Sequence, residues 1–187
     1  MSVALIILAV VVGGALLIGI YAISVYNTLV RQRNEAEEAF KTIDVFLKQR
    51  YDLIPNVVNT VKGYAQHESG TLEKVIQARN VAMAAGGHDG GMAEAGLATA
   101  LKSVFALAEQ YPDLKANTEF SKLQDTLTQI EEGIQRARRY YNATARAMND
   151  AVQTFPNNII AGMFNFKAMD YFDVDEASKE NVVVSFD

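Results

Sequence analysis

The chain has 187 residues, of which 50% are apolar and 21% charged, and its formal net charge is −5. The absence of cysteine excludes disulfides, thiolate metal sites, a cysteine nucleophile and a lipoprotein anchor. The sequence also lacks the broad basic face that binds phosphates, so nucleic acid is not expected as a partner.

The chain begins with a long apolar run. It extends from Val3 to Val25, and no charged side chain precedes Arg31. As a helix, a run of this length spans roughly 34 Å, which fits a hydrocarbon core of about 30 Å with some tilt. Tyr21 and Tyr26 fall at the downstream boundary, where aromatic rings sit well among lipid headgroups. We therefore predict a transmembrane anchor over residues 1–27.

A cleaved signal peptide is the competing interpretation of this run. Ala22 and Ser24 are small enough for a cleavage site. However, the segment has no lysine or arginine at its start, and it is longer than the apolar region of a signal peptide. The anchor is favoured.

The charges after the run predict its orientation. Arg31, Arg33, Lys41 and Lys48 follow the run, and no side-chain cation precedes it. The positive-inside rule then predicts a single-pass protein of the bacterial inner (cytoplasmic) membrane, with its N-terminus outside and its soluble part in the cytoplasm.

Small residues recur on one face of the predicted span, at Ala15, Gly19 and Ala22. Small side chains let two membrane helices approach closely, so this face is a candidate contact of a homo-oligomer. The alternative is that alanine and glycine are simply common in membrane helices.

Apolar side chains at helical spacing continue after the span. Ala36, Phe40, Ile43 and Leu47 recur three or four residues apart, which predicts an amphipathic helix. We expect residues 52–55 to interrupt this pattern, because proline disfavours the helical conformation of the residue before it. Three residues are the candidates for an inter-helix turn: Arg50, Asp52 and Pro55.

Three more amphipathic segments follow. The first spans residues 57–76, where Gly63 and Gly70 weaken the helix and Ser69-Gly70 predicts a local distortion. A glycine-rich loop at 86–91 comes after it. The others span residues 97–111, ended by Pro112, and 120–148, capped by Asn117 or Thr118. We predict an all-α protein: a single N-terminal transmembrane helix followed by an up-and-down four-helix bundle with long helices over residues 28–172. In the rival arrangement, the first two segments run collinear through Pro55.

Several motifs together resemble the LemA family. They are Tyr26-Asn27, Arg33-Asn34, Ile43-Asp44-Val45, Arg50-Tyr51-Asp52-Leu53-Ile54-Pro55-Asn56, Lys62-Gly63-Tyr64-Ala65, His67-Glu68, Ala78-Arg79, Tyr111-Pro112-Asp113-Leu114, Tyr141-Asn142 and Phe155-Pro156. They cover nearly all of the chain after the span. The resemblance implies an anchored, up-and-down helical bundle and no established enzymatic activity. Family members often lie near a membrane metallopeptidase in genomes, which makes such a peptidase or another membrane protein a candidate partner.

No pattern in the sequence predicts catalysis. His67-Glu68 starts like a zinc-binding HExxH helix, but Thr71 stands where the second histidine is needed. The only other histidine is His88, in the glycine-rich loop, and that loop lacks the lysine of a phosphate-binding loop. We expect no catalytic residue, no cofactor and no metal, and we do not expect an enzyme.

The segment over residues 155–172 carries more apolar side chains than one short helix needs. Either it caps the bundle, or it offers a patch to a membrane surface or to another subunit. Its candidate contact residues are Ile159, Ile160, Met163, Phe164, Phe166, Tyr171 and Phe172.

The last segment, residues 173–187, carries five acidic side chains against one lysine. We expect a flexible acidic tail. Alternatively, the strand-like run Val182-Val183-Val184-Ser185-Phe186 adds to the sheet of a partner.

Two functions are compatible with these features. The first is a membrane-anchored structural or scaffolding protein that contacts the lipid bilayer, forms a homo-oligomer and organises or shapes the membrane. The second is an adaptor that presents its bundle or its tail to a membrane peptidase or a similar membrane partner.

Overall fold

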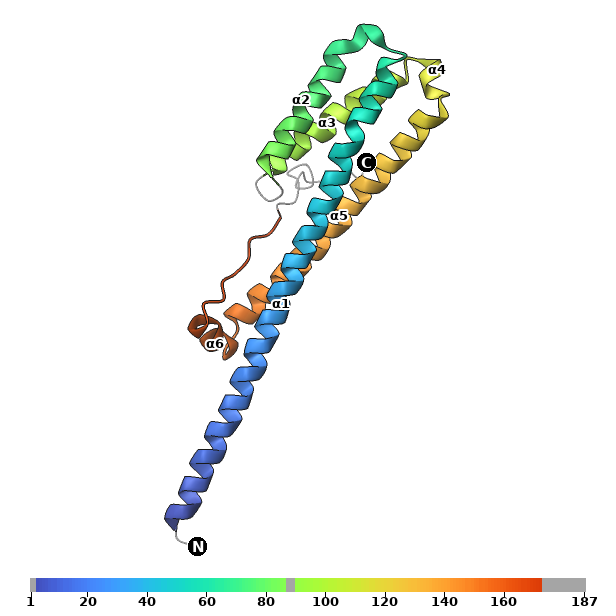
Figure 1. Ribbon diagram of the computed structural model, residues 1–187. Helices are drawn as coiled ribbons and strands as arrows, with labels where there is room; N and C mark the ends of the chain where they lie inside the picture. The colour runs from blue at the N-terminus through green and yellow to red at the C-terminus, as the bar shows by residue number, and fades with distance from the viewer. Residues whose placement is uncertain (1–2, 87–89, 173–187) are drawn as a thin grey trace, which may run out of the picture. The chain divides into compact units, whose positions relative to one another are not determined.

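The structure is a computed structural model that describes residues 3–86 and 90–172. Its helices are α1 (Val3–Lys62), α2 (Ser69–Ala85), α3 (Gly91–Ala108), α4 (Pro112–Lys115), α5 (Thr118–Gln153) and α6 (Asn157–Met163), with a short 3₁₀ helix, η1 (Gln66–Glu68), before α2 (Figure 1). The described residues contain no strand, so the all-α prediction is confirmed.

The chain divides into two compact units. Among the described residues, unit 1 comprises residues 3–40 and 139–171, and unit 2 comprises residues 41–86, 90–138 and 172. Helices α1 and α5 contribute residues to both units.

Four helices build the core of unit 2. Its buried apolar side chains include Ile43, Leu47, Ile54, Val57 and Val61 of α1, Leu72, Val75 and Ala82 of α2, Leu97, Leu101 and Val104 of α3, and Phe120, Leu127, Ile130 and Ile134 of α5. These positions follow the helical spacing of the sequence, because each helix buries one face. In Figure 1 the green helices α2 and α3 lie side by side along this part of α1.

The predicted break over residues 52–55 is wrong. Pro55 lies inside α1, which continues to Lys62, so Arg50, Asp52 and Pro55 form no inter-helix turn. Proline costs about 3 kcal/mol inside a helix. Ile54, Val57 and Val61 are completely buried on the same face of the helix, and burying each such side chain contributes about 1.5–3 kcal/mol, which outweighs that cost.

The chain turns at Gly63 instead. The backbone N–H groups of Tyr64 and Ala65 both bond to the carbonyl of Val61, at 3.0 and 2.9 Å, which closes the last turn of α1. The helix then resumes as η1 and, from Ser69, as α2. The break therefore falls at residues 63–65, ahead of Ser69-Gly70, where the distortion is predicted; Ser69 and Gly70 themselves lie in α2.

Unit 1 contains the N-terminal part of α1, the C-terminal part of α5, α6 and the segment that follows α6. Its core is formed by Val25, Leu29, Met148 and Ala161. The apolar stretch that precedes Val25 is not covered by the chain. In the described part of the chain, α1 is the one helix long and apolar enough to cross a membrane, which suggests a membrane anchor.

Candidate functional site

The centre of unit 2 contains a charged side chain that has almost no exposed surface. Arg50 of α1 is 2% exposed, and its guanidinium forms ion pairs with Glu94 of α3 and with Glu131 of α5. The Arg50 Nη1–Glu131 Oε1 distance is 2.6 Å. One arginine therefore joins three helices, and because a buried charge is costly unless it is paired, this pairing is what allows Arg50 to lie in the core.

Tyr51 and Arg79 extend this group. The Tyr51 hydroxyl donates a hydrogen bond to Glu94, and burial raises the pKa of Tyr51 above its usual value, which keeps the phenol protonated as a donor. Arg79 Nε of α2 donates to the backbone carbonyl of Tyr51 at 2.7 Å.

That carbonyl is the one Pro55 leaves without its helical partner. In an α-helix the carbonyl of Tyr51 would accept the N–H of the residue four positions on, and proline has no N–H. Arg79 supplies the missing donor from a neighbouring helix. We call Arg50, Tyr51, Arg79, Glu94 and Glu131 the Arg50 network.

The chemistry of the Arg50 network is that of a structural core. Its charged groups pair with one another, and its two central members, Arg50 and Glu94, are 2% and 4% exposed. Within residues 3–86 and 90–172, no three histidine, cysteine or acidic side chains gather as metal ligands. His67 lies in η1, and His88 lies outside the described residues.

Sequence reasoning missed Glu94, although a signal was present. Glu94 precedes Leu97, Leu101 and Val104 at helical spacing, which places a carboxylate on the buried stripe of α3. Arg50 likewise follows Ile43 and Leu47 on the stripe of α1. Opposite charges on two apolar stripes indicate a buried pair, since each charge needs a partner there.

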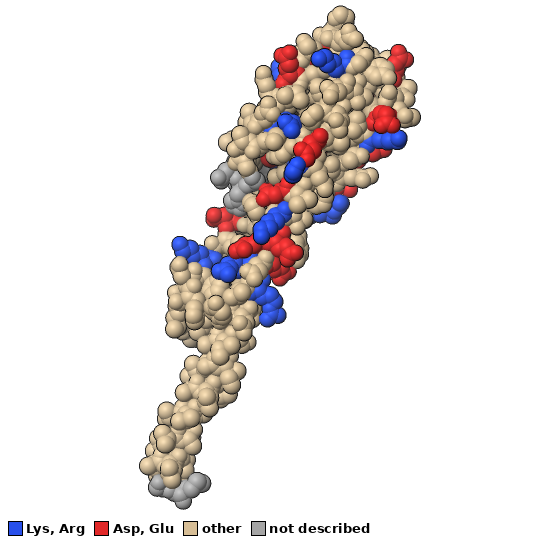
Figure 2. Space-filling view, viewed as in Figure 1, with Lys and Arg blue, Asp and Glu red and all other residues tan. Residues whose placement is uncertain are grey.

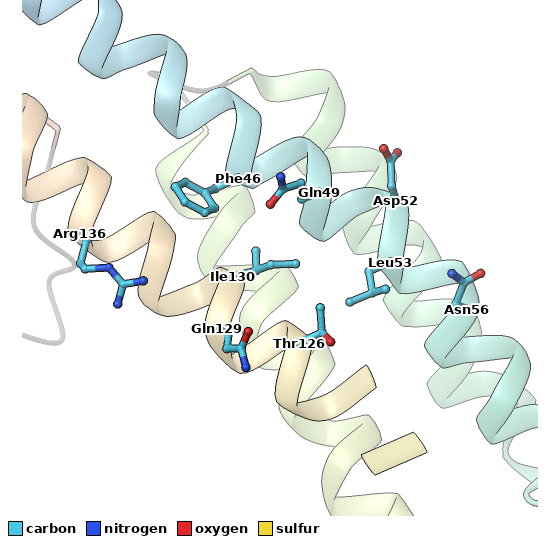
Figure 3. A pocket seen from close by; sticks show the side chains of 9 residues that line it. All are labelled: Phe46, Gln49, Asp52, Leu53, Asn56, Thr126, Gln129, Ile130 and Arg136. Carbon is cyan, nitrogen blue, oxygen red and sulfur yellow. The ribbon is translucent and has the colours of Figure 1, made fainter. Parts of the chain in front are cut away.

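An open groove of about 640 Å³ runs between α1 and α5 on the surface of unit 2 (Figure 3). Leu53 and Ile130 point toward each other across it. Asp52 is at its rim, where it pairs with Lys48 at 2.6 Å in an exposed contact within α1. At one end the ring of Phe46 lies against the backbone of Gly133, so close that an added Cβ atom would be 2.6 Å from it.

Unit 1 holds an aromatic cluster at the end of the apolar run. Tyr26 of α1 packs on Phe164 and Phe166, with ring centroids 4.7 and 5.7 Å apart. The Arg33 guanidinium lies 5.5 Å from the centroid of Phe166. One turn earlier on α1, the Tyr21 hydroxyl donates to the Asn157 side chain of α6 at 2.7 Å. These contacts place α6 beside residues 21–26 of α1.

The end of α6 returns the chain to the core of unit 1. The N–H of Phe166 bonds to the carbonyl of Ala161 at 2.9 Å, and that of Asn165 to Gly162 at 3.3 Å, with Asn165 at φ 56°. This is a Schellman motif, in which asparagine tolerates the left-handed conformation. Asn149 of α5 then holds Met169 through two hydrogen bonds, of 2.9 Å from its amide and 2.7 Å to its carbonyl.

The candidate contact residues thus divide into exposed and covered sets. Those exposed are Ala15, Gly19, Ile159, Met163, Phe164 and Tyr171. Those partly or fully covered are Ala22, Ile160, Phe166 and, in unit 2, Phe172. The Arg138 guanidinium lies 5.4 Å from the ring centroid of Phe172. The predicted tail, residues 173–187, lies outside the described residues.

The family of the chain follows from its comparison with known proteins. The sequence model of the LemA family matches residues 39–186. The chain belongs to the LemA family.

This LemA-family protein is similar to named proteins of three bacteria. It is 28% identical over 163 residues to the protein LemA of Metamycoplasma hominis, with 85% of its own chain and 74% of that relative covered. It is 23% identical over 185 residues to the magnetosome protein MamQ of Magnetospirillum gryphiswaldense and to MamQ 1 of Paramagnetospirillum magneticum. Each of these two matches covers 84% of the chain and 68% of the relative.

Proposed function

We propose that this LemA-family protein is a membrane-anchored, non-catalytic scaffold that self-associates and organises or shapes the bilayer. The main support is the continuity of α1: its apolar part is uncovered, and its next turns, at Val25 and Leu29, enter the core of unit 1. Because no linker separates the apolar part of α1 from the folded core of unit 1, the span holds that core in a fixed position relative to the bilayer. The polar groups of the Arg50 network are used for packing, which supports a non-catalytic role.

Self-association is proposed to use the small-residue face of the span. Ala15, Ala22, Leu29 and Ala36 follow one another at intervals of seven, so they lie nearly on one line along α1. Leu29 and Ala36 are completely buried in unit 1, whereas Ala15 is exposed. The face of α1 that packs inside unit 1 therefore continues as a face of small side chains in the part proposed to lie in lipid. Such side chains allow a second span to approach closely.

The test is the mass of the detergent-extracted protein, measured by light scattering over a range of concentrations. We expect a discrete oligomer for the wild type and a smaller species for Gly19→Leu, because leucine keeps the helices apart. Gly14→Leu, on a different face of α1, is the matched control and is expected to keep the oligomer. A wild-type protein that is monomeric at every concentration would refute self-association.

The second candidate is an adaptor for a membrane partner, such as a membrane peptidase. The groove between α1 and α5 favours it, because the half-buried Leu53 offers an apolar contact beside the polar side chains of Gln49 and Gln129. A photo-crosslinking side chain at Gln129 is expected to give a discrete adduct in native membranes, and one at the exposed Lys122 is not. Deletion of residues 173–187 separates the two candidates: an adaptor that uses its tail loses the partner, whereas the scaffold keeps its assembly.

A further inference from the structure

We propose that α6 and its flanking residues form a second membrane contact, an interfacial segment whose outer side chains enter the boundary between headgroups and acyl chains. The inference rests on the membrane anchor of the proposed function and adds a site to it. The occupant is the lipid bilayer itself, on the side where α1 leaves it.

The position of α6 along α1 supports this inference first. Asn157 binds Tyr21 and Phe164 packs on Tyr26, so α6 is attached at the downstream end of the apolar run. From Val3 to Tyr21, α1 rises by about 27 Å, close to the roughly 30 Å of a hydrocarbon core. With the run embedded in lipid, α6 lies at the depth of the interface.

The two faces of α6 also support an interfacial position. Ile160, Ala161 and Phe166 pack into the core of unit 1 and so act as its cap. The opposite side and the residues that flank it carry large apolar side chains that remain exposed: Phe155, Ile159, Met163 and Phe164, which are 75%, 52%, 73% and 55% exposed. The segment thus caps the core with one face and offers the other face to its surroundings.

The distribution of charge agrees with lipid as the surrounding medium. From Ala151 to Phe166 the chain has no acidic or basic residue, and the exposed Lys167 follows immediately. On α1 the first charges are Arg31 and Arg33. In Figure 2, the visible face of α1 and α6 carries no charge up to a group of basic side chains. An uncharged apolar face bordered by cations is typical of segments that lie in the membrane interface.

A soluble partner or a second copy of the chain fits these observations less well. The exposed face of α6 continues directly from the uncovered surface of the span, so one apolar medium covers both. If a protein covered α6 instead, neither the continuous apolar surface nor the basic residues that follow it would be explained.

The absence of tryptophan from the chain allows a direct test. Four single-tryptophan variants of the full-length protein are reconstituted into vesicles of phosphatidylcholine and phosphatidylglycerol, with and without lipid brominated near the headgroup end of the acyl chain. Met163→Trp reports on α6, Leu17→Trp on the span, and Val81→Trp, at a 59% exposed position of α2, on the water-exposed body. Ile159→Trp is a second fluorescent reporter on α6, in case Met163→Trp perturbs folding.

We expect Met163→Trp and Ile159→Trp to emit at shorter wavelength than Val81→Trp and to lose most of their fluorescence in brominated vesicles. Val81→Trp should be unaffected by bromine. Water-like emission at both α6 positions, or blue-shifted emission that bromine does not quench, overturns the inference; the second result identifies a protein surface as the cover.

Leu17→Trp separates this inference from the proposed function. Quenching of Leu17→Trp without quenching at α6 means that the anchor holds and the interfacial contact fails. Quenching at α6 without quenching of Leu17→Trp leaves the interfacial contact standing while the anchor fails. If none of the variants is quenched, both proposals fail.

Discussion

Arg50 shows that the stability of unit 2 depends on single buried side chains. Its guanidinium and the Glu94 carboxylate are both almost completely buried, so each neutralises a charge that water cannot reach. The spacing of apolar residues in the sequence already places both side chains on buried stripes. Their pairing could not be read from the sequence, because it depends on the rotation of α3 about its axis relative to α1.

Glu94→Gln is therefore expected to lower the free energy of unfolding by about 3 kcal/mol, since it leaves Arg50 with only Glu131 as an anionic partner. The measurement is urea unfolding in mild detergent, followed by circular dichroism. Glu132→Gln is the matched control: it breaks an exposed pair with Arg136 and should cost less than about 1 kcal/mol. Equal effects of the two substitutions would contradict a structural role for the buried pair.

Pro55 and Arg79 form a second testable pair at this scale. Arg79→Met leaves the Tyr51 carbonyl without a donor and is expected to cost about 1–3 kcal/mol of unfolding free energy. In a Pro55→Ala background the same substitution should cost less, because the new N–H of residue 55 can bond to Tyr51 within the helix. The measurement is a double-mutant cycle by urea unfolding. Additive effects would mean that Arg79 does not compensate for the proline.

At the scale of elements, α1 shows why one prediction from the sequence is wrong. Proline before an apolar segment predicts a new helix, and as a local rule this is sound. The rule is overridden because Ile54 and Val57 lie on either side of Pro55 on the same buried stripe. Packing against the other helices and a donor on α2 are tertiary effects, which local sequence does not contain.

Two glycines inside helices give a prediction about the packing of α1 on α5. Replacing a helical glycine by alanine usually stabilises by about 1 kcal/mol. Gly96→Ala in α3 should reach this gain, since nothing lies within 4 Å of the added atom. Gly133→Ala should gain less or be destabilising, because the new atom meets the Phe46 ring at 2.6 Å.

Thermal unfolding of the two variants, compared with the wild type, checks the difference. Adding Phe46→Leu to each variant provides the control: it should recover stability lost in Gly133→Ala, and it should add no gain to Gly96→Ala. A full gain for Gly133→Ala alone would show that the ring moves freely into the groove.

For the whole molecule, composition and pattern were sufficient for the main features. Four amphipathic segments and one uncharged apolar run predicted an all-helical chain with a helix able to cross a membrane. The two-sided character of α6 could not be predicted. Ile159 and Ile160 are adjacent apolar residues in the sequence, and only the Schellman turn at Asn165 and the contacts to Tyr21 and Tyr26 determine which of them faces the core.

The absence of cysteine makes the orientation of the whole molecule testable. A single cysteine at the exposed position Gln110 is expected to escape a membrane-impermeant maleimide in intact cells and to react after permeabilisation. This outcome follows from the basic residues after the span, which favour a cytoplasmic body. A cysteine introduced at Ser2 provides the reverse control. Labelling of Gln110→Cys in intact cells would place the body on the outer side.

The unbroken course of α1 has a mechanical consequence. Successive residues of a helix are rotated by about 100°, so the direction in which Gly19 faces is fixed relative to that of Leu29 in the core of unit 1. Under the proposed self-association, a twist imposed on the apolar part of α1 by a neighbouring copy would reach the packing of α5 and α6, because no linker separates that part from the core of unit 1.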